Sequence, residues 1–209
     1  MPVLGVILAG GLSRRMGGGD KPLLRLGGRT LLDRVHERFA AQCAAGVILN
    51  ANGDPERFAA FPGPIVPDGV PGHPGPLAGI LAALDHAAEC HPNVAYVASV
   101  TGDAPFLPDD LVQRLGDAVS GGRLENDRTI AVASSGGRQH FTMALWSLAL
   151  RNDLRAALVE RDERRVGAYL ARHGAVAVEW AAAPIDPFLN VNTPEELEAA
   201  EALLLSREG

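Results

Sequence analysis

A stretch of small and charged residues near the start of the chain has the composition of an anion-binding loop. Residues 8–24 contain five glycines, the arginines Arg14 and Arg15, and Lys21. Glycine lets successive backbone N–H groups turn into one concavity, where they can hold an anion. Arg15 and Lys21 add full positive charges, so the stretch predicts a ligand with several phosphate oxygens. Its spacing matches neither the Walker A loop nor the dinucleotide-binding fingerprint.

A carboxylate that could hold a metal ion follows an apolar segment in the middle of the chain. Asp103 comes shortly after residues 94–100, whose apolar composition predicts a buried strand. Ligands of parallel sheets bind in the crevice outside the carboxyl ends of the strands. Mg²⁺ takes one or two carboxylates and completes its shell with phosphates and water, so Asp103 is predicted to hold it. Asp20 and Asp68 lie in loops rich in glycine and proline, where aspartate also serves turns.

Three asparagines are candidates for polar contacts with a ligand. Asn50 ends a second apolar run, residues 47–49, and its carboxamide could bind a ribose hydroxyl or a base edge. Asn190 and Asn192 are two residues apart, so they face the same side of an extended segment. A predicted helix follows at Thr193, and helix N-termini attract anions. We therefore expect Asn192 to contact an acceptor phosphate or a metal ion.

Alternating strands and helices are predicted to carry these residues. Apolar, β-branched runs predict strands at 3–8, 47–49, 94–100, 129–133, 142–146 and 175–178. Helical spacing of apolar residues predicts helices at 30–43, 77–88, 108–119, 151–160, 166–173 and from Thr193 onward. This alternation predicts an α/β fold, a three-layer α/β/α sandwich with a mostly parallel sheet. Because no internal repeat or linker is visible, residues 1–209 are expected to form a single domain.

The composition limits the classes of protein to which the chain can belong. Its 209 residues are 47% hydrophobic and 21% charged, which is typical of a folded domain. The net charge of −6 and the lack of a long lysine and arginine run argue against nucleic-acid binding. No apolar run has the length of a membrane span or the flanks of a signal peptide, so a cytoplasmic protein is expected. Cys43 and Cys90 match no zinc spacing and are expected to be buried.

The glycine-rich stretch and several later segments together resemble one enzyme family. The pattern L-A-G-G-x-x-x-R-M-G-x-x-D-K is similar to the signature of nucleotidyltransferases, and its form here resembles the molybdenum cofactor guanylyltransferases. Further matches, in the same order, are N-A-N at 50–52, the aspartate at 68, G-P-L-A-G at 75–79, G-D-A-P-F-L-P at 102–108, and residues 163–166 and 188–197. Two departures change no charge: Pro22 stands where glycine or alanine is common, and Gly102 replaces the usual cysteine.

The resemblance implies a Rossmann-like nucleotidyltransferase fold and a reaction in which GTP donates GMP to the terminal phosphate of molybdopterin. It makes Asp103, Lys21 and Arg15 the catalytic residues and Asp103 the ligand of Mg²⁺. It implies that the nucleotide site contains Leu8, Ala9, Gly10, Gly11, Lys21, Asn50, Asp68, Asp103 and Asn192. Acceptor contacts are implied for Arg164, Arg165 and Asn190; His140, a lone histidine, could also contact the acceptor or serve a structural role. Besides GTP and molybdopterin, proteins that insert molybdenum or mature molybdoenzymes are candidate partners.

Three other functions remain open at this point. A cytidylyltransferase acting on the same pterin, or a sugar-1-phosphate nucleotidyltransferase, would differ in base pocket and acceptor. A non-catalytic nucleotide-binding regulator would be expected to lack Lys21 or Asp103, and this chain contains both. Residues 8–10 and 75–79 hold almost no polar side chains, so backbone groups are expected to read the base. Guanine offers N1–H and a 2-amino group beside O6, so GTP should be preferred to ATP and CTP.

Overall fold

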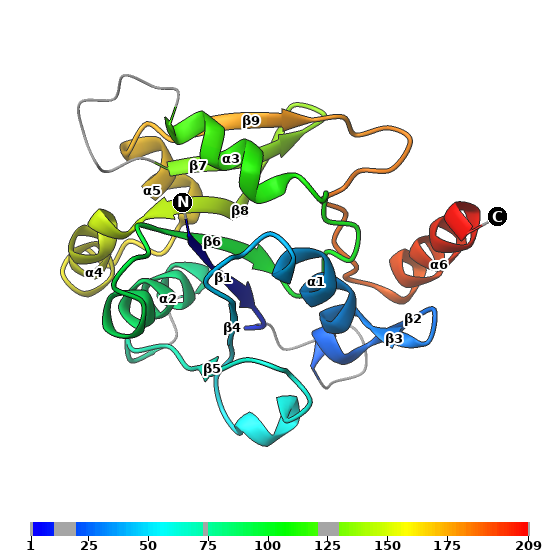
Figure 1. Ribbon diagram of the computed structural model, residues 1–209, viewed down its shortest axis with the longest axis horizontal. Coiled ribbons are helices and arrows are strands. Elements are labelled where there is room, and N and C mark those ends of the chain that lie inside the picture. Colours follow the sequence, from blue (N-terminus) through cyan, green and yellow to red (C-terminus); the bar gives the residue numbers. More distant parts are fainter. Residues whose placement is uncertain (1, 11–19, 73–74, 121–129, 209) are drawn as a thin grey trace.

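A central sheet organises the part of the chain that the computed structural model describes, residues 2–10, 20–72, 75–120 and 130–208. Within these residues the sheet has seven strands in the order β5-β4-β1-β6-β8-β7-β9 (Figure 1). These strands are β1 (Val3–Leu8), β4 (Val47–Asn50), β5 (Ile65–Val66), β6 (Tyr96–Thr101), β7 (Ile130–Ser135), β8 (Arg138–Ser147) and β9 (Val176–Trp180). A separate small sheet pairs β2 (Arg25–Leu26) with β3 (Arg29–Thr30).

The large sheet is mostly parallel, as predicted. The pairs β5–β4, β4–β1, β1–β6 and β7–β9 are parallel. Among the described strands of this sheet, β8 alone runs antiparallel to its neighbours, β6 and β7. Leu8 lies in register with Asn50 on one side and Thr101 on the other, so three strands end in one row. This row of carboxyl ends is where sheets of this kind bind ligands.

Helices cover both faces of the sheet, which confirms the three-layer α/β/α sandwich. The helices are α1 (Leu31–Ala40), α2 (Pro76–Cys90), α3 (Leu111–Ser120), α4 (Arg151–Val159), α5 (Val166–Arg172), α6 (Pro194–Glu208) and the short η2 (Lys21–Leu23), η3 (Pro55–Phe58) and η4 (Leu148–Leu150). α1 and α3 pack on one face, and α2, α4 and α5 on the other (Figure 1). Ile7 of β1 joins the first core and Val6 the second, so the strand is apolar on both faces.

A tight turn joins β7 to β8 and makes β8 longer than the sequence pattern predicts. Gly136 and Gly137 both have positive φ, 55° and 76°, the conformation of a two-residue hairpin turn. β8 therefore begins at Arg138 rather than near residue 142. As a result, His140 belongs to a strand of the sheet instead of the loop that the sequence pattern indicates.

The C-terminal helix α6 lies beside the small sheet of β2 and β3, and together they enclose a third apolar cluster (Figure 1). The helix begins at Pro194, directly after the predicted start at Thr193, and its first turn is closed by a capping box. Thr193 Oγ1 accepts from the N–H of Glu196, and Glu196 Oε2 accepts from the N–H of Thr193, both at 3.2 Å. The sequence pattern does not predict β2 and β3, because two-residue strands show no readable period.

The two cysteines differ in exposure. Cys43 is buried, and burial raises the pKa of its thiol to about 12. Cys90, at the end of α2, is exposed, so the expectation that both are buried is wrong. In the ranges that the structure describes, no helix combines the length and apolar character needed to cross a membrane.

Candidate active site

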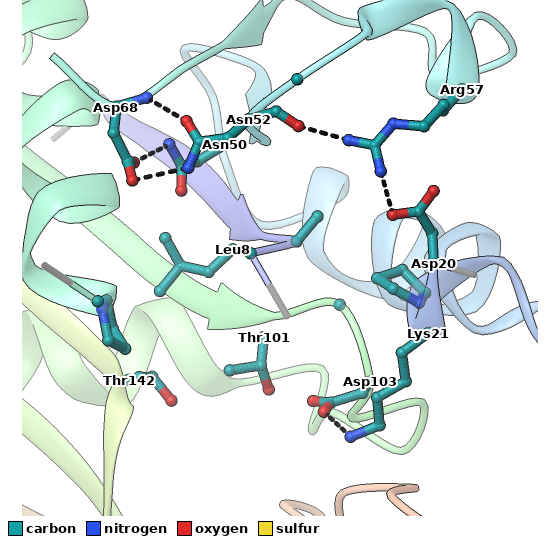
Figure 2. A pocket seen from close by; sticks show the side chains of 17 residues that line it. Leu8, Asp20, Lys21, Asn50, Asn52, Arg57, Asp68, Thr101, Asp103 and Thr142 are labelled. Carbon is teal, nitrogen blue, oxygen red and sulfur yellow. Dashed lines mark hydrogen bonds and ion pairs between the residues drawn. The ribbon is translucent and has the colours of Figure 1, made fainter. Parts of the chain in front are cut away.

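A cavity of about 480 Å³ lies at the row where β1, β4 and β6 end (Figure 2). It collects residues from four separate parts of the chain that the sequence singles out: Leu8, Ala9, Gly10, Lys21, Asn50, Asp68 and Asp103. Gly11 and Arg15, which belong to the same predicted site, lie outside the described residues. Residues 8–10, Lys21 and the acidic strand end thus lie in one crevice, as the strand-end rule predicts.

A cation and a carboxylate meet at the floor of this cavity. Lys21, the first residue of η2, donates from Nζ to Asp103 Oδ2 and to Asn192 Oδ1, the latter at 2.5 Å. The N–H of Val191 donates to the carbonyl of Asp103 at 2.9 Å, which holds the segment of Asn190 and Asn192 against the end of β6. One ammonium group therefore joins segments that are 82 and 171 residues away in sequence.

The free oxygen of Asp103 fits a metal ligand. Within the described residues, Asp103 Oδ1 is the one buried side-chain oxygen or nitrogen without a hydrogen-bond partner. Burying an unpaired oxygen costs free energy unless a ligand or an ion interacts with it. The described residues contain no group of three or more His, Cys, Asp or Glu side chains that could hold a metal ion. A free carboxylate oxygen suits a divalent metal ion that takes its other ligands from phosphates and water.

Two asparagines and an aspartate form a hydrogen-bonded network on the opposite wall of the cavity. Asn50 donates from Nδ2 to Asp68 Oδ1 at 2.9 Å, and Asn52 donates to Asp68 Oδ2 at 2.8 Å. The N–H of Asp68 returns a bond to Asn52 Oδ1 at 2.8 Å. Figure 2 shows both amides pointing toward Asp68. The network ties the end of β4 to the loop after β5 and fixes the position of the carboxylate in the cavity.

An ion pair that sequence reasoning missed borders the cavity. Arg57, in η3, pairs with Asp20 through Nη1 and Oδ1 at 2.5 Å, and it also donates to the carbonyl of Asn52 (Figure 2). No motif points to Arg57, because its ionic partner, Asp20, is 37 residues away in sequence. Asn52 could have been found, since it lies two residues after Asn50 and so shares its side of an extended segment.

Part of the backbone expected to read the base is already used within the sheet. The N–H of Ala9 donates to the carbonyl of Asn50 at 2.9 Å, and the carbonyl of Leu8 accepts from Gly102 at 3.1 Å. Fewer backbone groups are therefore available to a base than the sequence indicates. The carboxylate of Asp68 lies in the same cavity and supplies acceptors of its own.

A second cavity, of about 630 Å³, adjoins the first, and Thr142 lines both. His140, Arg165 and Asn190, three of the residues expected to contact an acceptor, line this second cavity. Arg164 does not line it and pairs with Asp162 at 2.7 Å. Of the two neighbouring arginines that were both expected to contact an acceptor, Arg165 lines this cavity and Arg164 does not.

Gly79 leaves room for the Asn50 side chain, and we predict that replacing it by alanine disrupts the site. A Cβ at residue 79 would lie 2.1 Å from Asn50 Oδ1 and 2.9 Å from Leu8 Cδ2, too close for either atom to stay in place. Overpacking of this kind costs about 1–3 kcal/mol, and the displaced Asn50 should also weaken nucleotide binding. Urea unfolding and GTP titration measure the two effects.

Gly116, in α3, provides the matched control, because a Cβ there would meet no atom within 4 Å. Gly116→Ala should stabilise the protein by about 0.5–1 kcal/mol, through helix propensity alone. If Gly79→Ala behaved like Gly116→Ala in both measurements, the close approach at Asn50 would have no consequence.

The two departures from the family pattern touch each other, and we predict that they are energetically coupled. A Cβ on Gly102 would lie 3.2 Å from both Cβ and Cγ of Pro22, so one of the two residues would have to shift by a few tenths of an ångström, and Pro22→Ala removes the contact with Cγ. Gly102→Ala should therefore destabilise the protein more when Pro22 is present than in a Pro22→Ala background. The expected coupling energy from a double-mutant cycle in urea is about 0.5–1 kcal/mol. Additive effects would mean that the two positions vary independently.

The chain is similar to known proteins over nearly its whole length. A family profile described as MobA-like NTP transferase domain matches residues 5–176. A Nitrobacter hamburgensis protein named molybdenum cofactor guanylyltransferase is 52% identical over 202 residues, which are 97% of this chain and 94% of that protein. One of the same name from Rhodopseudomonas palustris is 52% identical over 200 residues, 96% of this chain and 93% of that protein.

A solved structure shares the fold. The crystal structure of molybdopterin-guanine dinucleotide biosynthesis protein A from Archaeoglobus fulgidus superposes with a TM-score of 0.73 at 20% identity. The match covers 98% of this chain and 100% of that one. At this level of identity the likeness establishes the architecture, and the chemistry has to be argued from the residues of the site.

Proposed function

Since the chain belongs to the MobA-like NTP transferase family, we propose that it transfers GMP from GTP to the terminal phosphate of molybdopterin. An oxygen of the acceptor phosphate forms a bond to the α-phosphorus of GTP, the bond from that phosphorus to the β-phosphate oxygen breaks, and pyrophosphate leaves. The observation that carries the proposal is the Lys21–Asp103 pair at the carboxyl edge of the sheet, with one buried carboxylate oxygen unpartnered among the described residues.

The residues of the site fit a reaction that needs charge neutralisation more than acid–base catalysis. A phosphate is already ionised at neutral pH, so the acceptor needs no strong general base, and positioning and electrostatics supply most of the rate. Asp103 would hold Mg²⁺, which would offset negative charge on the phosphates of GTP. Lys21 places its ammonium beside that carboxylate, where it can bind the β- and γ-phosphates and the departing pyrophosphate.

The nucleotide is proposed to lie across the first cavity. Leu8, Ala9, Gly10 and Asn50 would line the base and the ribose, because they form its wall at the ends of β1 and β4. A carboxylate oxygen accepts more than one hydrogen bond, so Asp68 can accept from guanine N–H groups while it keeps its asparagine partners. Gly11 and Arg15 complete the phosphate site in this proposal.

The acceptor is proposed to lie in the second cavity, which opens next to the first at Thr142. Its walls combine the half-exposed ring of Phe141 with Arg165 and Asn190, which suits a flat heterocycle that carries a phosphate. Asn192 connects the two sites, because it accepts from Lys21 and donates to the carbonyl of Asn190, which lines this cavity. A cytoplasmic location, a single domain over residues 1–209 and further partners in molybdenum insertion or molybdoenzyme maturation stay predictions.

The proposed function is tested by pyrophosphate release with molybdopterin as acceptor and GTP, CTP, ATP or UTP as donor. We expect turnover with GTP and Mg²⁺ and a preference over ATP and CTP of about tenfold or more, since an unpaired buried polar group costs about 1–3 kcal/mol. A preference for CTP would indicate a cytidylyltransferase, and turnover with a sugar 1-phosphate in place of molybdopterin would indicate the sugar class. Tight GTP binding without turnover on any acceptor would indicate a non-catalytic binding protein.

A further inference from the structure

A histidine that lines the second cavity is hydrogen-bonded to a serine, and the serine to an aspartate. Ser135, the last residue of β7, donates from Oγ to Asp186 Oδ1 at 2.8 Å. Its Oγ also lies 2.7 Å from Nε2 of His140, on the neighbouring strand β8. Asp186 Oδ1 is held in turn by the N–H of Phe188 at 2.9 Å.

The chemistry of these three groups settles where the protons lie. An ionised carboxylate can only accept, so the single hydroxyl proton of Ser135 is used in the bond to Asp186. Ser135 Oγ must then act as acceptor toward the imidazole, and His140 must carry a proton on Nε2. In a neutral ring this leaves Nδ1 without a proton, as a hydrogen-bond acceptor.

The surroundings keep the ring neutral and in place. Burial lowers the pKa of His140 below its ordinary value of 6.5; Asp186 and Glu179 oppose that shift, and Arg138 adds to it. The ring of Phe188 packs against the imidazole with centroids 4.7 Å apart. At neutral pH the side chain is therefore a neutral imidazole in a fixed orientation.

The unprotonated nitrogen is accessible, on a side chain that lines the second cavity. Ser135 is the hydrogen-bond partner of the His140 ring among the described residues, so Nδ1 has none there. Nδ1 is also absent from the buried unpartnered atoms, a class that Asp103 Oδ1 alone occupies in the described part of the chain. His140 lines the second cavity, so a ligand in that cavity can reach the exposed acceptor.

We propose that Ser135 and Asp186 are positioning residues that fix the tautomer of His140, so that its Nδ1 accepts a hydrogen bond from an N–H group of the heterocycle in the acceptor pocket. This inference rests on the proposed function, because a pterin supplies such donors in its ring N–H and its amino group. It makes His140 a specificity determinant. A heterocycle with only acceptors at this edge would leave its own lone pair and that of His140 Nδ1 without a hydrogen bond.

Two substitutions of His140 separate ligand binding from a purely structural role. Asparagine places an acceptor oxygen near the position of Nδ1 but cannot reach Ser135, whereas glutamine reaches the position of Nε2 and lacks a group at Nδ1. We expect the dissociation constant of molybdopterin to rise by about tenfold in His140→Gln and His140→Ala, and by less than about threefold in His140→Asn. GTP affinity should change in none of them. The reverse order, or equal loss in all three, would overturn the proposal.

The tautomer itself is measured on the ligand-free protein by proton–nitrogen NMR of the imidazole. Wild-type protein should show a protonated Nε2 and a bare Nδ1, and Ser135→Ala should give a mixture of tautomers together with weaker molybdopterin binding. A protonated Nδ1 in the wild type would overturn the proposal. Because binding is measured apart from turnover, molybdopterin that binds without GMP transfer would reject the proposed function and leave the role of His140 intact.

Discussion

Replacing Asp103 by asparagine should lower the rate of GMP transfer by about 10²–10³-fold, which corresponds to roughly 3–4 kcal/mol of lost transition-state stabilisation. The substitution keeps the shape of the side chain but removes the negative charge that would hold Mg²⁺. That charge matters most as pyrophosphate leaves, when negative charge builds up on the departing oxygens. Pyrophosphate release as a function of Mg²⁺ concentration measures the effect, and saturation should shift to higher Mg²⁺.

The fold should survive this change. Asp103 Oδ1 has no partner among the described residues, so its replacement by a neutral amide breaks no hydrogen bond of that oxygen. Asp109→Asn is the matched control: its side chain is 83% exposed, pairs with Arg38 and does not line the first cavity. We expect full activity from the control and similar thermal unfolding for both variants. Near-wild-type turnover in Asp103→Asn would remove this residue from the mechanism.

Replacing Lys21 by methionine should lower the affinity for GTP by about 10²-fold, and the affinity for GMP by less than about threefold. An ammonium within 4 Å of a phosphate oxygen gains about 4 kcal/mol at an effective dielectric near 20, before desolvation is subtracted. GMP lacks the β- and γ-phosphates, so it should be almost insensitive. Calorimetric titration of the two nucleotides decides the matter, and equal losses would show that Lys21 does not bind the β- and γ-phosphates.

Lys21 can also be tested without substitution, because it is the sole lysine of the chain. Amine-directed acylation therefore has one side-chain target besides the N-terminus, and GTP should protect it where GMP does not. Lys21→Arg should not restore activity in full, since a planar guanidinium replaces a compact ammonium between Asp103 and Asn192. Arg29→Met serves as the control, because Arg29 pairs with Glu37 on the surface and does not line the first cavity.

The sequence by itself determined the layered architecture and the position of the nucleotide site. The apolar runs of β1, β4 and β6 are continuous, as in central parallel strands, and such strands end at the same edge. Any chemistry-bearing residue directly after them must therefore face one crevice. That rule places Asn50 and Asp103 in one crevice, and Lys21, from the stretch that follows β1, lines the same cavity.

Tertiary structure decided the partners of these residues. In the sequence, Gly79 is one of several small residues in a predicted helix. Only the packing of α2 against Asn50 shows that a side chain at this position would collide with the asparagine. The glycine turn between β7 and β8 sets their register and brings Ser135 next to His140. The loop that contains Asp186, distant in sequence, then hydrogen-bonds to Ser135. Local patterns carry periodicity, and periodicity indicates which face of an element is buried. Which side chains then touch across elements depends on loop lengths, crossing angles and side-chain rotamers, which no short stretch of sequence contains.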